Sequence, residues 1–262
     1  MRRASVEFST ATKSEWSWCI PPPQWEIYDQ VIQGAQALEI SFALGGAFAL
    51  ASHTGAWRNT KDLDLYVLPN ESRRMIALLE SLGLADYYQK VPYDRWWIYR
   101  GYKDETIVDV IWAMANHRAQ IDELWLSGPP VEIHGRRVPV VPAEAMLWDK
   151  LYIMQRDRCD WPDALNLLYA RGRDLNWEYL LGRIGEDWPL LAGVLEVFRW
   201  CSPGNAQMLP EWIWERLQLP KSPKEQMPEV DRRRVALLDT RPWFGEDRRS
   251  QQPAASGRAG EC

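Results

Sequence analysis

The chain has 262 residues, of which 46% are hydrophobic, and this suffices for one large domain or two modest ones with true cores. Its formal net charge of −5 argues against a protein that holds nucleic acid by a bulk positive field, although RNA stays compatible as a substrate of a locally basic surface. Four scattered cysteines, no apolar signal region at the first residues and no apolar run of membrane-spanning length together indicate a soluble, cytoplasmic protein.

The first quarter of the chain begins with a polar segment and continues into a helix and a glycine turn. Residues 1–22 form the polar N-terminal segment, which ends in a stiff run of prolines. Apolar residues then recur at three- and four-residue steps over 24–39, which predicts an amphipathic helix. The stretch 41–55 is typical of an apolar strand, a turn at Gly45 and Gly46, and an apolar helix.

Residues 23–141 predict a mixed α/β domain of the α+β type, with a mixed sheet flanked by helices. Its later elements are a strand over 62–68, a helix over 71–82, antiparallel strands over 95–102 and 106–112, a helix over 117–126, and a hairpin over 131–140. The pattern turns helical over 142–204, with helices near 143–155, 160–171, 177–186 and 188–200. Residues 205–262 are rich in proline and charge and are expected to form a mostly irregular or disordered tail.

The strand over 62–68 contains two acids one residue apart. Side chains alternate across a strand, so Asp62 and Asp64 leave one face while Leu63 and Leu65 leave the other. Two like charges about 4 Å apart repel by roughly 4 kcal/mol at an effective dielectric constant of about 20. A divalent cation removes this penalty, and Mg²⁺ is commonly held by carboxylates together with the phosphates of a nucleotide. An isolated pair of this kind is also compatible with a solvated strand face, so its surroundings decide.

Two neighbouring motifs favour the metal interpretation. Gly45 and Gly46 precede an apolar helix, where glycines let the backbone approach a phosphate and free N–H groups receive an anion. Asp109 interrupts the apolar run 106–112, and an aspartate in such a run is costly to bury unpaired. If this strand lies beside the first, Asp109 completes a cluster of three carboxylates.

These residues resemble the nucleotidyltransferase superfamily typified by DNA polymerase β. Its members carry a glycine turn, a helix, an Asp-apolar-Asp strand and a third acid on a later strand. The matching residues in this chain are Gly45, Gly46, Asp62, Asp64 and Asp109. The resemblance implies the nucleotidyltransferase fold, in which a mixed sheet flanked by helices is followed by a helical domain.

The stretch before the acid pair is similar to the Arg-x-Thr-x-Asp-x-Asp variant of AbiEii toxins and related minimal bacterial nucleotidyltransferases. Arg58 and Thr60 occupy its first two named positions, and the similarity extends over roughly residues 39 to 112. Arg58 is equally compatible with a solvated position in a loop.

A weaker similarity follows the sheet. Lys150, Asp160 and Asp163 are similar to a pattern on the two helices that those toxins carry after the sheet, although Cys159 stands where a lysine is usual. Lys150 is equally compatible with a stem that reaches the surface of its apolar helix. Asp160 and Asp163 stand at a helix start, where carboxylates also cap the helix and complement its dipole.

The resemblance implies a metal-dependent enzyme that transfers an NMP from an NTP to a hydroxyl group. Two divalent ions, Mg²⁺ or Mn²⁺, would be bound by Asp62, Asp64 and Asp109, and Asp109 would also accept the proton of the attacking hydroxyl. The residues expected to bind the nucleotide are Gly45, Gly46, Arg58, Thr60, Lys61 and Lys150.

Three functions remain open at this point. In the toxin-like interpretation the acceptor is RNA, tRNA in particular, and an antitoxin protein is the neutralising partner. An antibiotic adenylyltransferase of the aminoglycoside type is the second, because an acidic protein favours a cationic acceptor. A non-catalytic nucleotide-binding or interaction protein of the same fold is the third.

Overall fold

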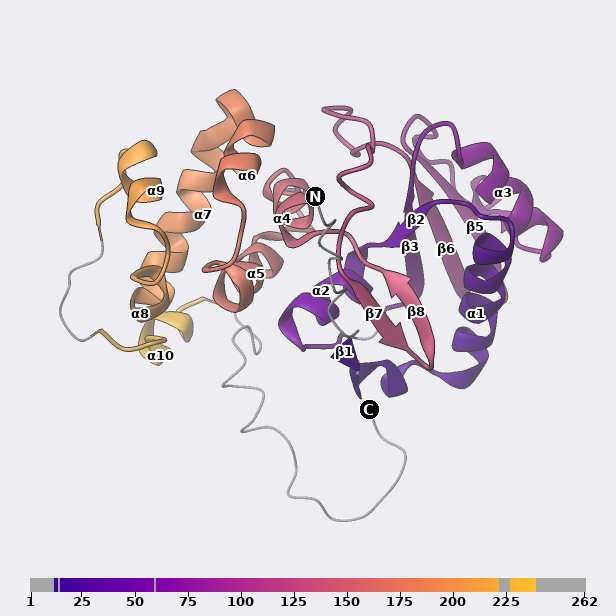
Figure 1. The fold of residues 1–262 in the computed structure, drawn as a ribbon, viewed down its shortest axis with the longest axis horizontal. Helices are drawn as coiled ribbons and strands as arrows, with labels where there is room; N and C mark the ends of the chain where they lie inside the picture. The colour runs from indigo at the N-terminus through magenta and orange to yellow at the C-terminus, as the bar shows by residue number, and fades with distance from the viewer. Residues whose placement is uncertain (1–11, 14, 59, 222–226, 239–262) are drawn as a thin grey trace, which may run out of the picture.

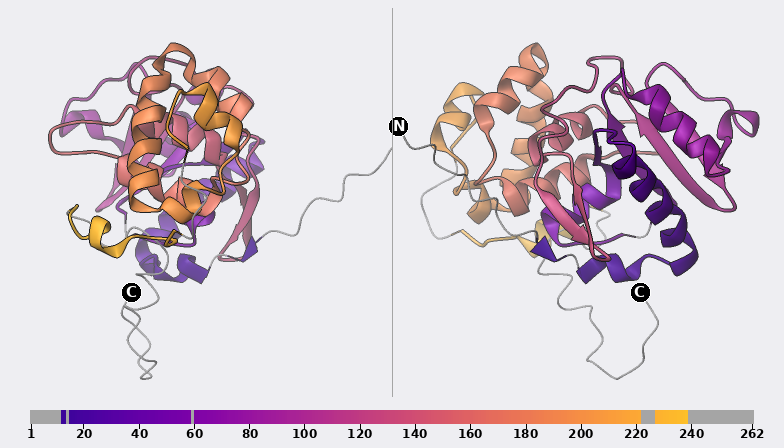
Figure 2. Two further views of the ribbon diagram at one scale, coloured as in Figure 1. Left: turned by 90° about the vertical axis from the view of Figure 1, so that its left-hand side faces the viewer. Right: turned by 45° about the vertical axis from the view of Figure 1, so that its right-hand side comes forward.

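The structure of the protein is a computed structural model that describes residues 12–13, 15–58, 60–221 and 227–238. Helices flank a central sheet, and the helices that follow residue 142 gather on one side of it (Figure 1, Figure 2). The expectations for residues 1–11 and for the end of the tail, 239–262, lie outside the described residues. No helix within the described ranges is long and apolar enough to cross a membrane.

The central sheet has five strands in the order β2-β3-β6-β5-β4. The strands are β2 (Phe42–Leu44), β3 (Asp62–Val67), β4 (Ala85–Asp86), β5 (Ile98–Lys103) and β6 (Thr106–Ile111). The central pair β3 and β6 runs parallel and the other pairs run antiparallel. The prediction of a mixed α/β fold with a mixed sheet flanked by helices is therefore confirmed.

A smaller sheet in the order β1-β7-β8 lies beside the first. Its strands are β1 (Thr12–Lys13), β7 (Pro130–Ile133) and β8 (Arg136–Pro139). The predicted hairpin over 131–140 is confirmed. It turns at His134 and Gly135, and both have positive φ, at 48° and 78°.

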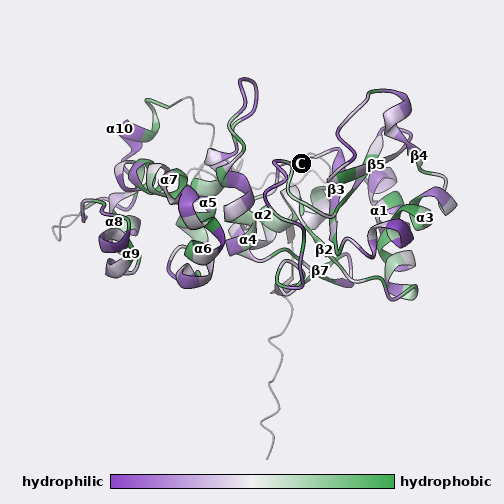
Figure 3. Cartoon of the chain, turned by 90° about the horizontal axis from the view of Figure 1, so that it is seen from above, coloured by the Kyte–Doolittle hydropathy of each residue, from purple (hydrophilic) through white to green (hydrophobic). Residues whose placement is uncertain are grey.

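Two helices, α1 (Pro22–Ala37) and α3 (Ser72–Ser81), pack against each other and contact β6. Each carries hydrophobic and hydrophilic residues on different sides, as amphipathic helices do (Figure 3). The alternation along β3 sends the fully buried Leu63 and Leu65 to one face of the sheet, and Asp62 and Asp64 to the other face, where they line a pocket.

Helix α1 begins earlier than predicted, within the run of prolines. Pro22 is its first residue, so the prolines start the helix and are not only a break before it. Proline suits the first turn of a helix because its fixed φ matches the helix and the N–H that it lacks has no partner there.

The predicted helix over 117–126 is wrong. This segment forms turns, His117 has a φ of 61°, and a bridge joins Ala113 to Gln120. Ile121 and Trp125 are four residues apart and both buried, which imitates the spacing of a helix. Trp125 instead fills the space between the rings of Tyr66 and Trp148, at centroid distances of 5.5 and 5.6 Å.

The predicted helices of the second half are present, with shifted ends. They are α4 (Ala143–Leu151), α5 (Trp161–Arg171), α6 (Trp177–Ile184) and α7 (Trp188–Cys201). Three shorter helices follow: α8 (Pro203–Ala206), α9 (Glu211–Arg216) and α10 (Arg232–Val235). Short 3-10 turns complete the described elements: η1 (Glu15–Cys19), η2 (Tyr87–Gln89) and η3 (Gly185–Asp187). The division of the chain into domains at residues 22, 141 and 204 stays a prediction.

Phe48, on helix α2 (Gly46–Thr54), lies at the centre of an aromatic cluster. The ring of Phe48 is fully buried and lies 5.3 to 5.8 Å, between centroids, from the rings of Trp16, Tyr28 and Trp57. Trp16 and Trp57 also stack on each other at 5.1 Å. The cluster therefore joins the N-terminal turn η1, helix α1 and the loop that precedes β3.

We expect Phe48→Ala to lower the free energy of unfolding by about 3–5 kcal/mol, because it removes a fully buried ring from a packed cluster. Urea unfolding followed by tryptophan fluorescence measures the change. Leu237, which is 76% exposed, provides the control, and Leu237→Ala should stay within about 0.5 kcal/mol of the wild type. Equal losses in the two variants would contradict the assignment of Phe48 to the core.

Candidate active site

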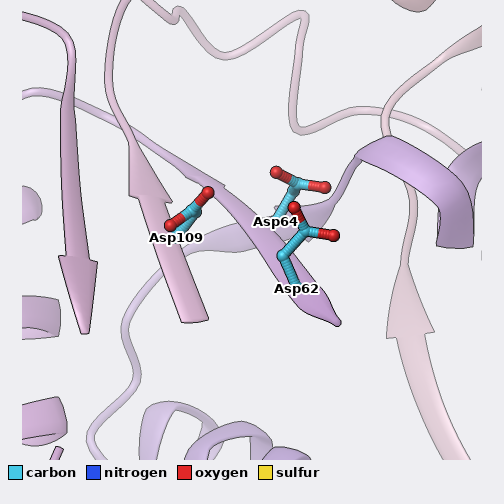
Figure 4. Close-up of side chains that lie close together, drawn as sticks. All are labelled: Asp62, Asp64 and Asp109. Carbon is cyan, nitrogen blue, oxygen red and sulfur yellow. The ribbon is translucent and has the colours of Figure 1, made fainter. Parts of the chain in front are cut away.

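Three carboxylates meet on the open face of the central sheet. Asp62 and Asp64 leave β3 on the same side, and the parallel register sets Asp64 directly beside Asp109 of β6. One oxygen of each carboxylate lies within 4.8 Å of those of the other two, and the three side chains project together (Figure 4). The structure thus brings the predicted acidic residues into one cluster.

The cluster is electrostatically strained because like charges share a partly desolvated site. Burial and, in addition, the charges of Asp62 and Asp109 together raise the pKa of Asp64 from 3.8 to about 8. Burial also raises the pKa of Asp109, although the guanidinium of Arg100 opposes this shift. Carboxylate oxygens so arranged are the ligands that Mg²⁺ and Mn²⁺ prefer, so the donor set fits a divalent cation.

The glycine turn approaches the acids so closely that a side chain has no room there. Gly46 has a φ of 48°, and a Cβ on it would lie 1.7 Å from Oδ2 of Asp64. A Cβ on Gly45 would lie 2.1 Å from the ring of Tyr66. The N-terminus of α2, with its free N–H groups, therefore begins beside the carboxylate of Asp64.

A pocket of about 200 Å³ opens over the cluster. Of the residues predicted for the site, those that line it are Gly45, Gly46, Arg58, Thr60, Asp62, Asp64, Asp109 and Lys150. Lys61 does not line it and is exposed, since the residue before Asp62 points away from the face that Asp62 occupies. Five further polar residues in the lining escaped the sequence analysis: Tyr66, Arg100, Asp149, Gln155 and Arg158.

Lys150 on α4 is the centre of a basic wall of the pocket, which it forms with Arg58 and Arg158. Its side chain is 6% exposed, and its ammonium group bonds to Asp160 and lies 2.9 Å from Asp163. Of the two alternatives left open for Lys150, the one in which its stem reaches the surface is therefore wrong. Burial disfavours the ammonium ion, but Asp163 and Asp160 outweigh this effect and raise the pKa of Lys150, so it stays charged at neutral pH.

Asp160, directly before α5, and Asp163, in its first turn, both pair with basic side chains of this wall. Asp160 precedes α5 but its side chain makes no capping hydrogen bond there. It accepts from Arg158 instead, at 2.9 Å, while Asp163 lies 3.2 Å from Arg58. Capping therefore does not explain Asp160, and both carboxylates hold basic side chains at the edge of the pocket.

Two residues contact the acids themselves. The hydroxyl of Thr60 donates to the carboxylate of Asp62. Arg100 stands opposite Asp109 on β5 and donates from Nε to Oδ1 at 2.8 Å and from Nη2 to Oδ2 at 2.6 Å. The sequence predicted these antiparallel strands but ended the first at residue 102, a register that would set residue 99 opposite Asp109. In the structure Lys103 pairs with Thr106, and this register sets Arg100 there.

We expect Asp64→Asn to stabilise the metal-free protein at alkaline pH. Folding raises the pKa of Asp64. Between pH 3.8 and about 8 the folded state therefore keeps a proton that the unfolded state has already lost, and stability falls as the pH rises through this window. Each unit by which a pKa is raised corresponds to about 1.4 kcal/mol. An amide does not titrate and escapes this loss.

Urea unfolding with EDTA at pH 5 and at pH 8.5 measures the effect. The advantage of Asp64→Asn over the wild type should grow by at least about 1.4 kcal/mol between the two pH values, the equivalent of one pKa unit. Asp104, exposed in the turn between β5 and β6, provides the control variant Asp104→Asn, for which no such growth is expected. The interpretation fails if the difference between Asp64→Asn and the wild type is the same at both pH values.

Comparison with known proteins gives weak structural neighbours and one clear family. The antibiotic-resistance factor ANT(2'')-Ia has a TM-score of 0.48 and 19% identity, covering 65% of this chain and 96% of its own. The lincosamide antibiotic adenylyltransferase LnuA, bound to lincomycin, has a TM-score of 0.40 and 16% identity, covering 56% and 96%. An antigenic nucleotidyltransferase-like protein from Paracoccidioides brasiliensis has a TM-score of 0.40 and 16% identity, covering 68% and 94%.

None of the curated proteins matches the chain. A family model described as "uncharacterised nucleotidyltransferase" matches residues 41–202, a range that begins just before β2 and ends just after α7. That range contains the glycine turn, the three acids and Lys150. The chain belongs to this family of uncharacterised nucleotidyltransferases.

Proposed function

We propose that this protein is a metal-dependent nucleotidyltransferase that transfers an NMP from an NTP to a hydroxyl acceptor and releases pyrophosphate. The observation that carries the proposal is the cluster of Asp62, Asp64 and Asp109, whose oxygens lie within 4.8 Å of one another in a pocket that also contains the glycine turn. Membership of a nucleotidyltransferase family supports the same chemistry.

The charges of the pocket support a requirement for metal ions. Its basic lining residues are Arg58, Arg100, Lys150 and Arg158. The carboxylates that line it or bond to those basic residues are Asp62, Asp64, Asp109, Asp149, Asp160 and Asp163. Each of the four basic residues is paired with one of these carboxylates, so the metal-free pocket offers little free positive charge to a polyanion such as a triphosphate. Bound by Asp62, Asp64 and Asp109, two Mg²⁺ or Mn²⁺ ions would supply this charge and stabilise the entering and leaving oxygens.

The glycine turn and the basic wall would hold the triphosphate in place. Gly45 and Gly46 leave the N–H groups of the first turn of α2 open to an anion, and the helix dipole favours a negative charge there. Lys150 is fixed by two carboxylates and needs little ordering to contact a phosphate. Arg58 and Thr60 would add contacts from the loop before β3.

The geometry limits the roles that Lys61 and Asp109 can take. Lys61 is exposed outside the pocket, so it would contact phosphate groups only at the rim. Asp109 would accept the proton of the attacking hydroxyl through a lone pair that Arg100 leaves unused, because a carboxylate has about four acceptor sites and the guanidinium occupies two.

RNA is the acceptor that we propose, with the end of a tRNA as the first candidate and an antitoxin protein as the partner that would neutralise the enzyme. The similarity of the Arg58 and Thr60 stretch to toxin enzymes supports this choice. A cationic antibiotic is the second candidate acceptor, and the net charge of −5 and the excess of carboxylates in the pocket favour it.

The test incubates the protein with each labelled NTP, Mg²⁺ and a mixture of total RNA, protein and aminoglycosides. We expect label in RNA, and a loss of about 100-fold or more in Asp62→Asn and in Asp64→Asn, because each variant removes charge that holds an ion at the reacting phosphate. Asp104→Asn should transfer at the wild-type rate. Label in an aminoglycoside selects the second acceptor. Binding of Mn²⁺ and NTP without any transfer would leave only the non-catalytic member of the fold, and the proposal would fail.

We expect Gly46→Ala to weaken Mn²⁺ binding, because its methyl group would lie 1.7 Å from Oδ2 of Asp64 and displace this carboxylate. Gly55 supplies a matched control: it also has positive φ, at 71°, but a Cβ there meets no atom within 4 Å. Isothermal titration with Mn²⁺ should therefore show wild-type affinity for Gly55→Ala and at least about a tenfold loss for Gly46→Ala. Equal affinities in the two variants would show that the close approach of Gly46 does not matter for the ion.

A further inference from the structure

Arg100 binds the most deeply buried member of the acidic cluster with both arms of its guanidinium. The side chain of Asp109 is 2% exposed and that of Arg100 is 33% exposed. The two stand opposite each other in the antiparallel register of β5 and β6, and each oxygen of Asp109 accepts one N–H. Such a bidentate pair fixes both the plane and the direction of the carboxylate.

The pair leaves Asp109 able to bind an ion as well. A carboxylate has about four acceptor sites, of which the guanidinium takes two. An oxygen of Asp109 still lies within 4.8 Å of the oxygens of Asp62 and Asp64. Arg100 and a metal ion can therefore share Asp109, each on its own lone pairs.

Arg100 is also a fixed positive charge beside the place where an ion would bind. Its guanidinium stays charged at any ordinary pH, and hydrogen bonding to Asp109 raises its pKa further. Its charge relieves the repulsion among the three acids in the metal-free protein. The same charge repels a divalent cation, so Arg100 favours the arrangement of the ligands and opposes the affinity of the site.

We propose that Arg100 is a positioning residue of this site, one that holds Asp109 in the orientation for metal-assisted transfer and lowers the affinity of the acidic cluster for the metal ion. The inference rests on the proposed function. It separates two effects of one side chain, because orientation depends on the forked geometry of the guanidinium while the opposition to the ion depends only on its charge.

This separation sets opposite expectations for affinity and for rate. Arg100→Gln removes the charge and the fork, so Mn²⁺ should bind about five- to tenfold more tightly while kcat falls by about 100-fold. Arg100→Lys keeps the charge but donates from a single point, so the Mn²⁺ affinity should stay near that of the wild type while kcat falls by about tenfold. A merely structural role would weaken binding and lower the melting temperature together in both variants.

The experiment titrates Mn²⁺ calorimetrically into the full chain, wild type and variants, and measures melting temperatures and NMP transfer on the same samples. Arg95→Ala is the matched control, since Arg95 lies close by in sequence but pairs with Asp86 outside the pocket. It removes one positive charge from the surface and should leave Mn²⁺ affinity and kcat unchanged.

The outcomes distinguish this inference from the proposed function. A wild-type protein that binds no Mn²⁺ or transfers no NMP overturns the proposed function, and the role of Arg100 with it. If the wild type binds and transfers, but Arg100→Gln binds Mn²⁺ no more tightly or keeps its full kcat, only the role of Arg100 is overturned. A failure of Arg100→Gln to fold leaves Arg100→Lys to decide, because unchanged kcat in that variant also contradicts the proposal.

Discussion

The parallel pairing of β3 with β6 is the constraint on which the rest of the site depends. It sets Asp64 beside Asp109 in one register, and the alternation along β3 adds Asp62 to the same face. Three acids in so small a volume resist ionisation, because burial first and their mutual repulsion second raise the pKa of Asp64 and of Asp109. Such a cluster destabilises the metal-free protein, and for the same reason it strongly attracts a positive charge.

The neighbouring elements bring positive charge near the acidic cluster in two different ways. On β5, Arg100 bonds directly to one member of the cluster and relieves part of the repulsion. On α4, Lys150 is bonded to Asp160 and Asp163, so its charge acts on the cluster only through space, by opposing the rise in the pKa of Asp64. Because the side chains of the basic wall are already paired with aspartates, the acidic cluster keeps an excess of negative charge, which a divalent ion would offset.

The parts of the site that the sequence revealed are those carried by local spacing. Asp62 and Asp64 share a strand face by alternation, and Gly45 and Gly46 punctuate a strand and a helix, so both motifs are visible within a few residues. Asp109 needed one further assumption, the pairing of two strands, and the structure supplies it.

What the sequence did not reveal depends on contacts between elements. Lys150 finds its partners 10 and 13 residues further on, across the bend between two helices, and nothing in the spacing distinguishes that contact from a stem directed to the solvent. Arg100 depends on the length of one turn: the strands predicted over 95–102 and 106–112 would set residue 99 opposite Asp109. In the structure the turn is shorter, Lys103 pairs with Thr106, and Arg100 takes that position. The helix expected over 117–126 failed because burial of Trp125 between two other rings reproduced a helical spacing.

The site is also not confined to the sheet, since the loop that carries Arg58 and Thr60 is held from three directions. Trp57, directly before Arg58, packs against Phe48 of α2 and stacks on Trp16 of the N-terminal turn. Arg58 itself pairs with Asp163 of α5, and Thr60 bonds to Asp62. A change in the N-terminal turn or in α5 would therefore move the basic side chains relative to the acids without altering any acid. The positioning on which phosphoryl transfer depends is thus a property of the sheet and the helices together.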